Sequence, residues 1–87
     1  MAQLQWTVPG FGGKTYLVGL YHGEDSGHLM VHCNNKVMLV DFGVKTSKDY
    51  SFFLDEELFE VKIIQEDNGT YSYSMVHNEE IDSPHNR

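Results

Sequence analysis

Cysteine, basic residues and long apolar runs are all scarce in this 87-residue sequence. The lone Cys33 excludes an internal disulfide and favours a reducing compartment. No stretch approaches the roughly 20 apolar residues that span a bilayer. The first ten residues lack the basic start and the apolar run of a secretory signal. We therefore expect a cytoplasmic protein that does not contact membranes.

The shortage of positive charge argues against nucleic acid as a partner. Six Lys and Arg stand against thirteen Asp and Glu, which gives a net charge of −7. Such a chain repels nucleic acid and acidic membranes. Most of the excess lies in residues 49–87, which hold ten acids against Lys62 and Arg87. This acidic half is interpreted either as solvated surface or as a patch for a basic partner.

The content of hydrophobic residues, 40%, and of aromatic residues, 13%, is too high for a disordered chain. The length suits one modest core. We expect a single domain over residues 1–77, followed by a polar C-terminal tail over residues 78–87.

Alternation with period two dominates the sequence and predicts half-buried strands. Between Lys14 and Tyr21, for example, Tyr16, Val18 and Leu20 share one face. The segment LFEVKIIQED also suits a helix by composition, but its β-branched residues and the following turn favour a strand. Asn34-Asn35 and Asn68-Gly69 predict hairpin turns, and the glycosylation sequon at Asn68 is interpreted as part of the second turn. The run from Lys36 to Val40 is apolar on both faces, which predicts a central or covered strand. The fold class is therefore all-β, a small antiparallel β-sandwich or open barrel of six to eight strands, with at most one short helical turn.

The stretch Gly12-Gly13-Lys14-Thr15 is similar to the end of a phosphate-binding loop. The first glycine of that motif would have to stand at Val8, and a strand-like run follows instead of a helix. A Gly-rich connector between two strands is the interpretation that remains.

Histidines are numerous enough to raise the question of a metal site. His28 and His32 should share one face of a strand, about 13 Å apart along its axis, which is too far for one metal ion to bridge. Any site would need His22 or His77 from a neighbouring strand.

Groups suited to catalysis do not form a consistent set. Cys33 should face away from His32 and act as a small buried hydrophobe. The paired acids Glu56-Glu57 and Glu79-Glu80 lie in polar contexts that suit a general acid poorly. An aromatic stripe is interpreted as core or as a ligand-binding face; it contains Trp6, Tyr16, Phe52, Tyr71 and Tyr73. We expect no enzyme, no cofactor and no metal.

One acidic cluster surrounds the apolar SFFL and FEVKII stretches. It consists of Asp55, Glu56, Glu57 and Glu60. These carboxylates are interpreted either as charged gatekeepers against aggregation or as an interaction patch.

Taken together, the HCNNKVM hairpin, the SFFL strand before a short acidic turn, and a closing Val76-x-Asn78-x-x-Ile81 resemble a domain of the Fas apoptotic inhibitory molecule family. The resemblance covers about residues 15 to 82. It implies a cytosolic antiparallel β-sandwich without enzymatic activity that protects cells from death-receptor-triggered apoptosis through protein contacts. Family members carry two such domains in tandem, whereas this chain holds one, and the resemblance assigns no binding residues.

Two classes of function remain open. The first is a non-enzymatic interaction module with a protein partner, acting by strand pairing at a sheet edge or through an acidic face. The second is a ligand- or metal-binding β domain that uses His22, His28, His32 and His77.

Overall fold

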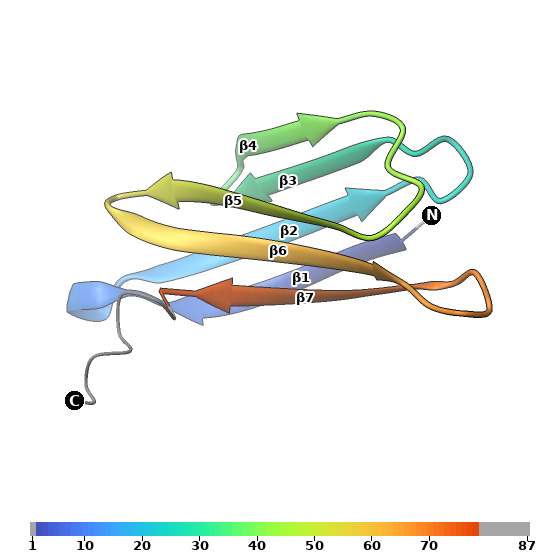
Figure 1. Ribbon diagram of the computed structural model, residues 1–87. Helices are drawn as coiled ribbons and strands as arrows, with labels where there is room; N and C mark the ends of the chain where they lie inside the picture. The colour runs from blue at the N-terminus through green and yellow to red at the C-terminus, as the bar shows by residue number, and fades with distance from the viewer. Residues whose placement is uncertain (1, 79–87) are drawn as a thin grey trace. The chain divides into compact units, whose positions relative to one another are not determined.

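The computed structural model describes residues 2–78, which form seven β-strands and one short 3-10 helix (Figure 1). The chain divides into two compact units, Met1–Thr46 and Ser47–Arg87. Each unit holds one antiparallel sheet. The predicted all-β class and the antiparallel pairing are confirmed, and the strand number lies within the predicted range. Among the described residues, the only helical segment is the 3-10 helix η1 (Phe11–Gly13).

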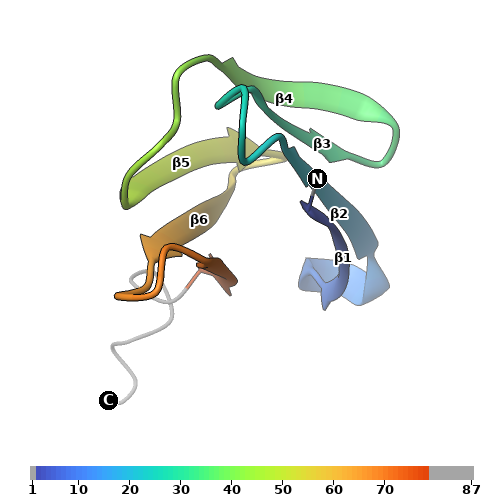
Figure 2. The ribbon, with the colours of Figure 1, turned by 90° about the vertical axis from the view of Figure 1, so that its right-hand side faces the viewer.

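The first unit holds a four-stranded sheet in the order β1-β2-β3-β4, which Figure 2 shows from the side. Its strands are β1 (Ala2–Pro9), β2 (Thr15–His22), β3 (Leu29–Cys33) and β4 (Lys36–Asp41). Lys14 leads directly into β2, so the Gly-rich stretch joins two strands, as the sequence predicts.

Side chains on the two inner strands of the first sheet alternate between two faces. Val18 and Leu20 on β2 and Val31 on β3 have no exposed surface, whereas Leu17, next to Val18, is 40% exposed. The register pairs Val18 with Cys33 and Leu20 with Val31, so buried residues stand opposite buried residues. The predicted face of β2 and the predicted burial of Cys33 are both confirmed.

The second unit holds a three-stranded sheet in the order β5-β6-β7. Its strands are β5 (Lys48–Leu54), β6 (Glu57–Gln65) and β7 (Tyr71–His77). The ambiguous LFEVKIIQED segment is a strand, and Phe59, Val61 and Ile63 are its fully buried residues. Of the aromatic stripe, Tyr16 is buried, and the other members are half-buried.

The expectation for β4 is wrong. This strand lies at the edge of its sheet, and Val37 and Val40 are 56% and 54% exposed. The cause is a β-bulge, because Val31 pairs with Leu39 but His32 pairs with Val37, which leaves Met38 between them. The extra residue brings Val37 and Val40 to the same face. The apolar run therefore reflects a bulged strand with an exposed apolar face.

Both predicted hairpin turns are present. Asn34 and Asn35 have φ values of 51° and 67°, which a two-residue type I′ turn requires. In the β6–β7 turn, Gly69 has φ 89°, and its N–H donates to Glu66 O at 2.9 Å. Asn68 Oδ1 accepts the backbone N–H of Thr70 at 3.1 Å.

In each sheet, an asparagine just after a strand adds two hydrogen bonds to one strand pair. Asn34 follows β3 and donates its N–H to Leu17 O, while its Oδ1 accepts the Leu17 N–H, both at 2.9 Å. Asn78 follows β7 with φ 55° and makes the same two bonds to Leu58, at 2.8 and 2.7 Å. We call this arrangement the asparagine clamp. Asn78 is therefore buried and bonded, while residues 79–87 of the expected tail lie outside the described residues.

The acidic turn between β5 and β6 carries backbone strain. Asp55 and Glu56 have φ values of 53° and 64°, a conformation in which most L-residues are disfavoured. Asn-Gly would adopt it at little cost.

Replacing the turn by D55N/E56G should raise the free energy of unfolding by about 1 kcal/mol. For a chain of this size, the melting temperature should rise by about 4–8 °C, which calorimetry can measure. The matched control is D55N/E56Q, which removes the same two charges and keeps a side chain at residue 56. An equal rise in the control would show that backbone strain at residue 56 does not destabilise the turn.

Candidate functional site

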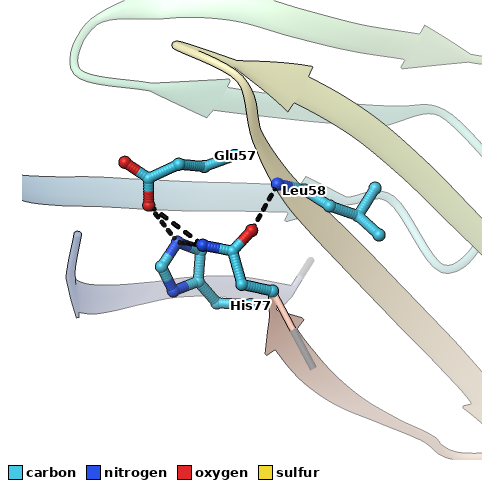
Figure 3. A network of polar contacts seen from close by, with 4 residues as sticks. Glu57, Leu58 and His77 are labelled. Atoms are coloured by element: carbon cyan, nitrogen blue, oxygen red, sulfur yellow. Dashed lines mark hydrogen bonds and ion pairs between the residues drawn. The ribbon is translucent and has the colours of Figure 1, made fainter. Parts of the chain in front are cut away.

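A buried polar network links the start of β6 to the end of β7 (Figure 3). Glu57 is 1% exposed, and its Oε1 lies 2.7 Å from His77 Nε2. Asn78 Nδ2 donates to the same oxygen at 3.1 Å. The antiparallel register explains the meeting, because Phe59 pairs with His77 and so places Glu57 beside the end of β7.

This network stabilises a carboxylate that would otherwise be costly to bury. With a proton on Nε2, His77 donates to Glu57, and the ring also packs on Phe59 with centroids 4.8 Å apart. Asn78 contributes its amide to Glu57 and its Oδ1 to the asparagine clamp on Leu58. The contacts therefore hold β7 onto β6.

The predicted acidic patch is divided by the fold. Asp55 and Glu56 are exposed at the turn, and Glu60 is half-buried on the opposite face of β6 from Glu57. Glu57 is not available to a partner, contrary to the expectation of a solvated acidic turn, because strand alternation directs it to the buried face with Phe59. The partners of Glu57 were not predicted from the sequence. The available signal was that Glu57 shares a strand face with Phe59 and Val61, which indicates that its carboxylate is buried and needs partners.

The histidines have different environments. His22 is fully buried, with Nε2 2.8 Å from Val44 O, on the opposite face of the first sheet from His32. His28 packs edge-on against Phe42, and His77 belongs to the Glu57 network. Among residues 2–78 there is no group of three or more His, Cys, Asp or Glu suited to hold a metal ion.

A second feature is the side of the first sheet that bears Tyr21 and His32, which we call the outer face. Two rows of paired residues cross all four strands of this face. One row is Gln5-Gly19-His32-Val37, and the other is Gln3-Tyr21-Met30-Val40. Each row runs from a glutamine on β1 to a valine on β4, so the outer face is polar at one edge and apolar at the other.

Three hollows lie along these rows, and Tyr21 lines all of them. The polar hollow measures about 290 Å³ and is lined, besides Tyr21, by Gln3, Leu4, Gln5, Gly19 and His32. The middle hollow, between His32 and Val37, measures about 260 Å³. The apolar hollow measures about 280 Å³, and its lining includes His28, Met30, Val40 and Phe42.

Exposed apolar side chains concentrate at the β4 side of the outer face. Val37 and Val40 are more than half exposed, and Phe42, just after β4, is 68% exposed. Clustered apolar exposure of this kind marks interaction sites more often than isolated exposed residues do. Sequence reasoning missed this face because it assigned the apolar run of β4 to the interior.

Comparisons with known proteins give no relative, since no family model, no curated protein and no solved structure matches the chain. The resemblance to the Fas apoptotic inhibitory molecule family therefore stays a prediction. Within the part of the chain that the structure describes, no helix has the length and apolar character of a membrane span.

Removing the side chain of Asn78 should destabilise the second sheet. In N78G the backbone conformation remains easy, but Leu58 N–H and Glu57 Oε1 each lose a partner, so the free energy of unfolding should fall by about 2 kcal/mol. N78A should cost about 1 kcal/mol more, because alanine disfavours positive φ. Urea unfolding of both variants measures the difference. A stable N78G would show that the asparagine clamp does not hold the strands.

Proposed function

We propose that the chain is a non-catalytic protein-interaction domain whose outer face binds an extended segment of a partner protein. One observation carries the proposal: Val40 and Phe42 are exposed together around the apolar hollow, and Val37 is exposed beside the neighbouring middle hollow. Burial of a large apolar side chain contributes about 1.5–3 kcal/mol, which is enough to anchor a peptide.

The size of the hollows favours side chains as ligands. Each hollow is slightly smaller than the roughly 300–1,000 Å³ pockets that enclose drug-sized ligands and cofactors. One aromatic or large aliphatic side chain suits the apolar hollow, because Met30, Val40 and Phe42 offer it apolar contacts. Because the other two hollows lie along the same two rows, a neighbouring part of the peptide can reach them.

The charges of the first unit also fit a neutral, apolar contact. Its three lysines, Lys14, Lys36 and Lys45, balance its three acids, Glu24, Asp25 and Asp41. The net charge of −7 thus belongs to residues 47–87. A partner segment that docks on the outer face needs no strong charge of its own.

The two mechanisms considered from the sequence have weaker support. Pairing at the β4 edge is hindered by the bulge at Met38 and by Lys36, two features that protect edge strands. Of the four residues of the acidic face, Asp55 and Glu56 are exposed, whereas Glu57 is buried and Glu60 is half-buried. A histidine metal site would need His22 or His77 beside His28 or His32. His22 lies on the opposite face of the first sheet from His32, and His77 is bonded to Glu57.

The family resemblance supports the cellular setting of this proposal. It suggests that the partner is a cytosolic protein in the control of death-receptor-triggered apoptosis. We propose that role together with the outer face as its contact surface.

Selection of random peptides displayed on phage against the full chain tests the proposal. We expect enrichment of peptides with an aromatic or large aliphatic anchor, and F42S should weaken their binding by at least about tenfold. The control is F53S, because Phe53 is similarly exposed, at 64%, but lies on β5 in the other unit. The proposal fails if no peptide is enriched, or if F42S and F53S weaken binding equally.

A further inference from the structure

The polar hollow has a construction of its own, based on Gly19. Gly19 pairs with His32 across β2 and β3. A Cβ atom at Gly19 would lie 2.3 Å from both Cε1 and Nε2 of His32. The imidazole therefore lies directly on the backbone of Gly19, in a position that no residue with a side chain would permit there. This contact places the ring at one side of the polar hollow.

The hollow contains hydrogen-bonding groups that the described residues leave unused. Tyr21 OH accepts a hydrogen bond from Gln3 Nε2 at 3.1 Å, so its own proton is directed elsewhere. Among residues 2–78, His32 Nδ1 is buried without a hydrogen-bond partner. Nε2 is then the ring nitrogen that a ligand can reach. The exposed amide of Gln5 offers one further donor and acceptor.

The electrostatics of the hollow select a neutral ligand. No Lys, Arg, Asp or Glu of the described chain lines it. A carboxylate would find no positive charge in this lining to pair with. An ammonium group would find no carboxylate, and an aliphatic group would leave the donors unpaired.

We infer that the polar hollow binds the carboxamide of an asparagine or glutamine side chain of the partner segment. A carboxamide is neutral and carries both an acceptor oxygen and a donor NH₂ group. Tyr21 O–H and the Gln5 amide donate to its oxygen. An unprotonated Nε2 of His32, or Gln5 Oε1, accepts from its nitrogen. This inference rests on the proposed function, since it names a second determinant of the same peptide.

The sheet geometry gives the spacing of the two determinants. The polar and apolar hollows are separated by about two strand spacings and one row, or roughly 12 Å. An extended peptide covers that distance in about four residues, and residues at i and i+4 point to the same side. The recognised segment therefore carries an apolar anchor and a carboxamide residue about four positions apart.

NMR titration of the full-length, ¹⁵N-labelled chain tests the inference with three capped amino acids. The probes are the N-acetyl methylamides of glutamine, glutamate and phenylalanine. We expect the glutamine probe to shift the amide resonances of Gly19 and His32 in a saturable way, with a Kd of about millimolar. The isosteric glutamate probe should bind at least about threefold more weakly, because its charge has no counter-charge.

Two variants identify the groups involved. Y21F keeps the ring but removes the hydroxyl, so binding of the glutamine probe should weaken by about threefold to tenfold. G19A displaces the imidazole and should have a similar effect. In both variants, shifts of Phe42 by the phenylalanine probe should persist, and a dispersed spectrum confirms the fold. The inference is overturned if the glutamine and glutamate probes bind equally, or if neither variant changes binding of the glutamine probe.

Failure of the inference can be distinguished from failure of the proposed function. Shifts of Phe42 by the phenylalanine probe, without selective glutamine binding, would reject the carboxamide site and leave the apolar anchor in place. Glutamine binding at Gly19 without any response around Phe42 would reject the apolar anchor.

Discussion

Register is the constraint on which the rest of the structure depends, and the asparagine clamps at Asn34 and Asn78 help to hold it. In a strand, a slip of one residue transfers every side chain to the other face. Each clamp prevents such a slip by attaching the residue after a strand to both backbone groups of one leucine on the neighbouring strand. Left-handed backbone geometry brings the asparagine side chain to that position, and asparagine tolerates it better than most residues.

Fixed register separates two kinds of surface on the first sheet. One side carries Val18, Leu20 and Val31, which are wholly buried. The other carries the two rows that end at Val37 and Val40, with Tyr21 common to all three hollows. The buried core and the proposed recognition surface thus use alternate residues of the same strands. The second sheet differs, because its buried face also contains the polar residue Glu57, which is hydrogen-bonded to His77 and Asn78.

Much of the fold follows from the sequence, because period-two alternation and turn residues act locally. The strands, the Asn34-Asn35 turn and the burial of Cys33 could all be predicted in this way. The bulge could not, because nothing in KVMLVD marks Met38 as the residue without a ladder partner. The partners of Glu57 were also missed, because His77 lies 20 positions away and approaches it only through strand pairing. The bulge also places Val37, and not Met38, opposite His32, so the β4 residues of the outer face could not be predicted either.

Because of the bulge, the length of β4 could change by one residue while its other side chains stay on the same faces of the sheet. Since Val31 pairs with Leu39 and His32 with Val37, Met38 occupies no step of the ladder. A chain without Met38 would keep all the residue pairs that β4 now makes with β3. It would form a regular antiparallel ladder with less local twist. This edge of the first sheet is therefore a place where one residue can be lost without moving the outer face, a tolerance that the interior strands β2 and β3 do not share.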